Sequence, residues 1–151
     1  MNIQQLNRED AEKVFITVEN NQNAVLEPGK VVEFSQTTTD ADQGRLVELV
    51  DAAVNLTTGI AAKVAGVVES TISTSEVGRL QVYGPANVRA SASIAAGVQV
   101  VASSINATNI GHVTTGTTST AVGPRYADSV VGWTLEDGPN ATNATVFLSL
   151  L

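Results

Sequence analysis

The segment Lys63–Gly84 constrains the fold more than any other part of the chain. It holds two apolar runs, Val64–Val68 and Leu80–Tyr83, separated by a connector rich in Ser and Thr. In the second run Leu80 and Val82 alternate with residues that point the other way. This period of two, with β-branched and aromatic residues, is typical of a half-buried strand. We therefore expect a β-hairpin or strand pair at the centre of a small β domain.

Glycines shape this strand pair. Gly66 lies inside the first run, where a residue without a side chain indicates a bulge or a close backbone approach. Gly84 is followed by Pro85, and this dipeptide predicts that the second strand ends there. The segment Val130–Glu136 repeats the pattern of Val64–Glu69: an apolar pair, Gly, apolar residues and then an acid. The two segments are either strands with similar bulges or equivalent strands that flank one core.

Short strands with Gly and Pro turns follow one another along the rest of the chain. Helix signals are few, although Arg45–Asn55 also fits a helical spacing. Ser103–Ala121 reads as a long loop with a weak strand at Ile110–Val113. The pattern predicts an all-β fold, a small antiparallel barrel or sandwich. The other expected strands are Ala11–Val18, Val31–Phe34, Arg45–Asp51, Asn87–Ala92, Val98–Ala102, Tyr126–Leu135 and Thr145–Leu151.

The length of 151 residues suits one domain, which we place at residues 11–151 behind an N-terminal arm at residues 1–10. The arm is polar, with Ile3 and Leu6 as isolated apolar residues. Aromatic residues make up only 4% of the chain, so Val, Ala, Leu and Ile must build the core. The expected scaffold comprises Gly66 and Gly84 as shaping residues and Leu80, Val82, Val131 and Trp133 as core side chains.

The charge distribution limits the classes of partner. The net charge is −7; residues 1–76 hold five Lys or Arg and twelve Asp or Glu, and residues 77–151 hold three of each. Such a chain is a poor nucleic-acid binder, because phosphate contacts need clustered Lys and Arg. No apolar run approaches the roughly 20 residues of a membrane span, and no signal peptide is visible. Only 15% of residues are charged, which suits a surface covered by other subunits.

The sequence offers little to catalysis. His112 is the only histidine and there is no cysteine, so a triad would have to use His112, and no GxSxG motif accompanies it. The segment Asp40–Gly44 resembles a calcium loop but lacks the bidentate Glu. No phosphate-binding glycine motif occurs. We expect no catalytic, cofactor-binding or metal-binding residues; an enzyme that depends on His112 or the Asp40 loop is the weaker alternative.

Taken together, the strand segments resemble the capsid decoration (cement) proteins of tailed bacteriophages. The order and spacing of the segments carry the resemblance, which covers about Ala61–Leu151 and an early strand pair. The segments are VLEPGKVVEF, AAKVAGVVES, GRLQVYG, AAGVQVVASS, YADSVVGWTLEDG and ATVFLSL.

The resemblance implies a structural virion protein without catalytic residues. Such proteins bind as homotrimers to the outer surface of an icosahedral head at three-fold and quasi-three-fold positions. There they bridge major capsid subunits and stabilise the shell against packaged-DNA pressure. Some relatives use an N-terminal arm that pairs with a capsid strand, and in this chain Ile3, Leu6 and Arg8 are the capsid-contact candidates. The expected location is the virion surface, after synthesis in the bacterial cytoplasm.

A second function class is a fibre- or spike-type module that binds a receptor or glycan. In that case the Thr- and Asn-rich segment Ser103–Ala121 would face a carbohydrate. Glycan binding without capsid binding would distinguish this alternative from the decoration protein.

Overall fold

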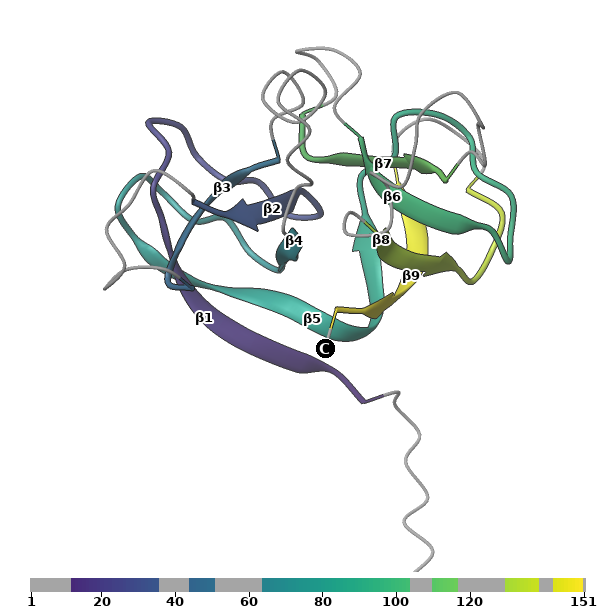
Figure 1. Cartoon of the computed structure of the whole chain (residues 1–151), viewed down its shortest axis with the longest axis horizontal. Coiled ribbons are helices and arrows are strands. Elements are labelled where there is room, and N and C mark those ends of the chain that lie inside the picture. Colours follow the sequence, from purple (N-terminus) through teal and green to yellow (C-terminus); the bar gives the residue numbers. More distant parts are fainter. Residues whose placement is uncertain are drawn as a thin grey trace, which may run out of the picture.

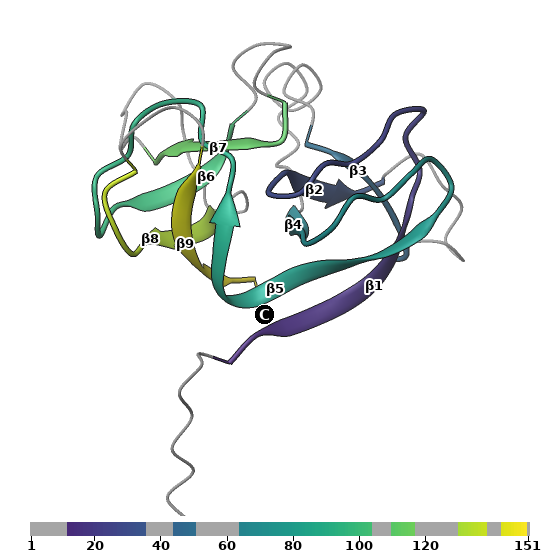
Figure 2. The same ribbon diagram turned by 180° about the vertical axis from the view of Figure 1, so that it is seen from behind.

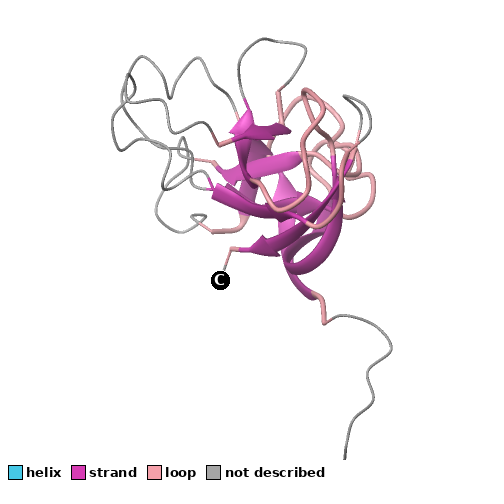
Figure 3. Ribbon diagram, turned by 90° about the vertical axis from the view of Figure 1, so that its right-hand side faces the viewer, coloured by secondary structure: helices cyan, strands magenta, loops and turns pink. Residues whose placement is uncertain are grey.

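The computed structural model describes residues 12–35, 44–50, 64–103, 110–116, 130–138 and 143–150. Within these ranges the chain folds into β-strands joined by turns, as Figure 3 shows. No helix there is long and apolar enough to cross a membrane. The all-β prediction is confirmed. The strands are β1 (Val14–Asn20), β2 (Val31–Phe34), β3 (Leu46–Leu49), β4 (Val64–Val68), β5 (Val77–Val88), β6 (Gln99–Ser103), β7 (His112–Thr115), β8 (Val130–Thr134) and β9 (Ala144–Ser149).

Five strands close into a barrel, which we call barrel 1. β1 pairs in parallel with β3, and antiparallel pairs then join β3 to β2, β2 to β4 and β4 to β5. The ring closes because β5 also pairs with β1, from Val14–Tyr83 to Glu19–Val77. The β4–β5 contact is the strand pair expected from Lys63–Gly84.

β5 is also the first strand of a second ring, barrel 2. Its C-terminal half pairs with β9, and the order continues through β8, β6 and β7. The ring closes where Ala90, just beyond β5, bridges Val113 of β7 in parallel. Figures 1 and 2 show β5 running from one group of strands to the other, with a sharp bend between them.

The two barrels have the same topology. β6, β7, β8 and β9 correspond to β2, β3, β4 and β5 of barrel 1, and the C-terminal half of β5 corresponds to β1. The parallel pair Asn20–Val47 has its counterpart in Ala90–Val113. Leu26 bridges Ile72 just as Ile94 bridges Gly138. The chain therefore contains an internal structural duplication.

The two similar sequence segments form the equivalent strands β4 and β8. Gly66 pairs with Val32 and Gly132 pairs with Val100, each beside a register shift. A Cβ at Gly66 would lie 2.8 Å from the Leu80 Cβ, and one at Gly132 would overlap the carbonyl of Phe147. Both positions favour glycine because an adjacent strand passes closely, with Leu80 and the Gln81 carbonyl beside Gly66 and the Phe147 carbonyl beside Gly132. The strands are equivalent, but each lines its own barrel instead of flanking one core.

Each barrel has its own set of buried side chains. Barrel 1 is filled by Val18, Leu26, Val32, Val47, Ala65, Val68, Ile72 and Leu80. The cluster of barrel 2 includes Val88, Val100, Val131, Val146 and Leu148, and it extends across the junction to Val31, Val50 and Val67 of barrel 1. Because this second cluster draws on both barrels, the barrels are packed against each other through apolar contacts.

The prediction that the second strand ends at Gly84-Pro85 is wrong. β5 continues to Val88, so it takes in the first two residues of the strand expected at Asn87–Ala92. Gly84 has a φ of +90°, which glycine adopts without a steric penalty and which permits the bend. Pro85 pairs with Phe147 of β9. Even-numbered residues here face β9, since Leu150 N–H donates to the Val82 carbonyl, whereas the N–H of odd-numbered Arg89 turns away and donates to Gly29. Pro85 is an odd-numbered position, so its missing N–H costs no bond to β9.

Trp133 is not a core side chain, so that expectation is wrong. It is 45% exposed, whereas Leu80, Val82 and Val131 are buried. The register between β6 and β8 shifts between Val100 and Val101, which face Gly132 and Val130. This bulge breaks the alternation of faces, so Val131 points into barrel 2 and Trp133 points outward.

Candidate functional site

Most of the residues predicted to contact a partner lie outside the described ranges. These are Ile3, Leu6 and Arg8 of the arm, Asp40 with its loop, and most of Ser103–Ala121. Within the last segment the weak strand expected at Ile110–Val113 overlaps β7 at His112 and Val113. The described part of the chain starts at Glu12, whose carbonyl packs directly over Gly84. The chain therefore reaches the body of the protein at the bend of β5.

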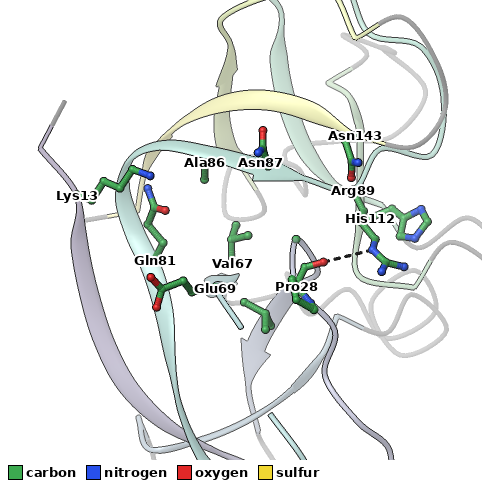
Figure 4. Close-up of a pocket in the computed structure, with 12 residues that line it drawn as sticks. Lys13, Pro28, Val67, Glu69, Gln81, Ala86, Asn87, Arg89, His112 and Asn143 are labelled. Atoms are coloured by element: carbon green, nitrogen blue, oxygen red, sulfur yellow. Dashed lines mark hydrogen bonds between the residues drawn. The ribbon is translucent and has the colours of Figure 1, made fainter. Parts of the chain in front are cut away.

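A groove with a volume of about 610 Å³ lies between the two barrels. Figure 4 shows Lys13 and Gln81 at one end of this groove and Arg89 and His112 at the other. Val67 of β4 lies between them. The groove is lined by Lys13, Pro28, Gly29, Val67, Val68, Glu69, Gln81, Ala86, Asn87, Arg89, His112 and Asn143.

Arg89 ties the two barrels together at one end of the groove. Its guanidinium lies 2.9 Å from the Glu27 carboxylate, and its Nε donates to the Pro28 carbonyl over 3.3 Å. Its backbone N–H donates to the Gly29 carbonyl over 2.8 Å. Lys30 adds a further link, because its Nζ donates to the Ile110 carbonyl over 2.8 Å. These cations are engaged in holding the junction.

Gln81 holds the bend of β5 at the other end. Its side chain is 5% exposed, and its Nε2 donates to the carbonyls of Tyr83 at 3.1 Å and Pro85 at 2.9 Å. The amide thus satisfies two acceptors on the side of β5 away from β9. The alternation in the sequence placed Gln81 on the outer face. That face is covered here because barrel 2 lies against it.

His112 begins β7 at the edge of the groove. Burial lowers its pKa, and the charges of Lys30 and Arg89 lower the pKa further, while a hydrogen bond to the Ala90 backbone and the Glu27 charge act in the opposite direction. Its Nδ1 is buried without a hydrogen-bond partner. His112 therefore sits beside cations, and none of the carboxylates that the structure describes is bonded to its Nδ1, as an orienting group of a catalytic base would be. In the described ranges no three His, Cys, Asp or Glu residues gather as a metal site.

The lowered pKa of His112 gives the first testable prediction. The unfolded histidine titrates near pH 6.5, and the folded one titrates lower, so below about pH 6.5 the unfolded state binds more protons. The contribution of His112 to stability is complete above that pH and decreases as the pH falls. When the pH is lowered from about 7.5 to 5.5, we expect the free energy of unfolding to fall less for His112→Gln than for the wild type. Urea unfolding at both pH values measures this difference; equal losses would contradict it.

No protein-family model matches the sequence, and no curated protein matches it. Among solved structures, the fold is similar to that of the head fiber gp8.5 N base in bacteriophage phi29, with a TM-score of 0.55 and 12% sequence identity. The similarity covers 92% of this chain and 96% of that chain, so it includes both barrels. At this identity the similarity concerns the fold.

The sequence reasoning missed the residues that form the groove. The groove lies at a junction between two barrels, and a junction was not part of the predicted single β domain. The residues that act there include Gln81, Arg89 and Glu27. The available signal was the repeated pattern at Gly66 and Gly132. Two equivalent strands in one short chain indicate two equivalent units, and two units imply a junction.

Proposed function

We propose that this chain is a structural protein of a bacteriophage head. It binds as a homotrimer to the outside of the shell at three-fold or quasi-three-fold positions, bridges major capsid subunits and stabilises the shell. The observation that carries the proposal is the fold similarity to a phage head fiber base across 92% of the chain. The decoration-protein resemblance of the strand segments supports the same class of function.

Several features of the molecule support a binding role over a catalytic one. The groove cations Arg89 and Lys30 are used in bonds across the junction. His112 lies among cations that lower its pKa. Charged residues make up only 15% of the chain, which suits a surface that is covered in an assembly.

Binding to phage heads tests the proposal directly. The purified protein is mixed with heads that lack it and sedimented, and light scattering gives the mass of the free protein. We expect saturable co-sedimentation and the mass of a trimer. A protein that stays in the supernatant at every concentration would remove the head-surface function.

Removal of Met1–Asp10 is expected to weaken head binding at least tenfold while the melting temperature stays unchanged. The arm carries the capsid-contact candidates Ile3, Leu6 and Arg8, and the described fold starts after it. An extended segment that adds to a partner strand contributes both main-chain bonds and side-chain pockets. The matched control replaces Ile3 and Leu6 with Ser and keeps the length. Unchanged binding after truncation would exclude the arm from the contact.

The fiber alternative has its own support, since the similar solved structure belongs to a head fiber. In that case the chain would form part of an appendage that binds a receptor or glycan. A glycan array probed with the labelled protein tests this function. Glycan binding without co-sedimentation with heads would favour the fiber alternative over decoration.

A further inference from the structure

The outer surface of barrel 2 carries an apolar patch, which we call the aromatic face. It comprises Tyr83, Pro85, Trp133, Leu135 and Phe147. Trp133 lies opposite Phe147, and Phe147 lies opposite Pro85, so the three side chains form one row across β8, β9 and β5. The Tyr83 ring meets the Phe147 ring edge to face at 5.2 Å. Trp133 is 45% exposed and Leu135 is 52% exposed.

In barrel 1 the corresponding face is covered by barrel 2. Val67 and Gln81 pair with each other as Trp133 and Phe147 do, and they are the equivalent residues of the duplication. Both are buried and line the groove at the junction. At this pair of positions the face is therefore covered in barrel 1, whereas in barrel 2 Trp133 is 45% exposed.

The turns beside these faces differ between the two barrels in the same way. Gly29 and Gly97 are equivalent, because their N–H groups donate to the carbonyls of Val68 and Thr134, which are equivalent residues in β4 and β8, and each bond is 2.9 Å long. A Cβ at Gly29 would lie 3.3 Å from Arg89 across the junction, whereas a Cβ at Gly97 would meet nothing within 4 Å. The turn of barrel 2 is held by the same backbone bond as the docked turn, and within the described ranges nothing lies against its Gly97 position.

We propose that the aromatic face and the Gly97 turn of barrel 2 bind barrel 1 of a second copy of this chain. The contact repeats between copies the junction that joins the barrels within the chain. The inference rests on the self-association in the proposed function and specifies its surfaces. Because the two surfaces differ, the contact is head to tail and continues from copy to copy until a ring closes.

The backbone of the receiving barrel can make this contact. Within the chain, Val31 N–H donates to the Gly111 carbonyl at 2.7 Å and Arg89 N–H to the Gly29 carbonyl at 2.8 Å. The equivalent bonds between copies run from Gln99 to Arg45 and from Glu19 to Gly97. In the free chain Glu19 N–H donates to the Arg45 carbonyl at 2.9 Å. Docking therefore exchanges one hydrogen bond for two and buries the aromatic face.

Cysteine cross-linking tests the pairing, since the chain has no cysteine of its own. The variants Gln99→Cys and Arg45→Cys are prepared separately and mixed under mild oxidation. Residues joined by a backbone hydrogen bond are close enough for a disulfide. We expect covalent dimers in the mixture and none from either variant alone. Gln99→Cys mixed with Ser70→Cys is the control for random collision, because Ser70 is exposed on barrel 1 just after β4, a strand that pairs with neither β1 nor β3.

The outcomes separate this inference from the proposed function. Dimers formed by one variant alone would indicate a symmetric contact and would overturn the head-to-tail pairing. No dimers from a protein that is a trimer in light scattering would also overturn it, while the trimer would stand. A monomer that still binds heads would overturn it and leave head binding intact.

A charge introduced on the aromatic face gives an independent test. We expect Trp133→Asp with Leu135→Asp to raise the concentration needed for assembly at least tenfold, because a carboxylate would be buried without a partner. Val25→Asp is the control, since Val25 is also a large exposed apolar residue and lies outside the strand pairings of β1 and β3. Equal assembly of both variants would overturn the role of this face.

Discussion

Gly84→Ala is expected to lower the free energy of unfolding by about 4 kcal/mol or more, which is exceptional for a single methyl group. Gly84 has a φ of +90°, a conformation that side chains disfavour by about 1–2 kcal/mol. The added Cβ would also overlap the backbone carbonyl of Glu12. Relief of this overlap would displace β1 from β5 at the bend that both barrels share. Urea unfolding monitored by circular dichroism measures the loss.

The matched control for this prediction is Gly44→Ala. Gly44 has nearly the same φ, +87°, but a Cβ there would meet nothing within 4 Å. It should cost only the conformational term, about 1–2 kcal/mol. Equal losses in the two variants would show that the close approach at Gly84 adds nothing to stability.

Leu80→Ala is expected to destabilise the protein by about 2–5 kcal/mol, the range for removal of a fully buried leucine. Leu80 is completely buried in the core of barrel 1, and Leu148 is completely buried in the core of barrel 2. Because β5 belongs to both barrels, we expect the two barrels to unfold together. Each variant, Leu80→Ala or Leu148→Ala, should therefore show a single cooperative transition. Differential scanning calorimetry measures the number of transitions.

Two separate transitions, with only one shifted in each variant, would contradict this coupling. The control is Val77→Ala at the exposed start of β5, which should change stability by less than about 0.5 kcal/mol. A similar loss at Val77 would mean that the measured effects do not arise from burial.

The strands were predictable where the alternation of apolar residues was local and clear. Val31–Phe34 and Val64–Val68 match the expected segments, because a half-buried strand shows its period of two directly in sequence. β7 was hidden inside a segment rich in Thr, Asn and Gly, where one buried residue, Val113, marks the strand. Its pairing with β6 is a tertiary contact that no local pattern reports.

The errors at Gly84-Pro85 and at Gln81 arise from the second barrel, and the error at Trp133 arises from a β-bulge. Gly84-Pro85 usually ends a strand, but here it bends a strand between two barrels. Trp133 was assigned to the core because it is apolar, yet the bulge at Gly132 turns it outward. The alternation with Leu80 and Val82 places Gln81 on the opposite face of a half-buried strand, yet the junction buries it. In each case the residue type is compatible with both environments, and the tertiary structure decides between them.

The arm residues Ile3, Leu6 and Arg8 stay a prediction from sequence. The groove at the junction was not foreseen, although Gly66 and Gly132 marked the equivalent strands on either side of it. A repeated bulge is visible in sequence, whereas the relation between two repeats depends on long-range packing. The aromatic face became apparent only through the comparison of the two barrels.

The sharing of β5 also sets an order of events at the ribosome. Barrel 1 has all of its strands once β5 has emerged, because that strand is its last. Barrel 2 lacks β9 until the end of the chain appears, although its first strand is already in place. During synthesis the half of β5 beyond Gly84 therefore lacks its β9 partner and has an unpaired strand edge. Since domains fold as units from the N-terminus, the finished barrel 1 acts as the platform on which the C-terminal strands assemble.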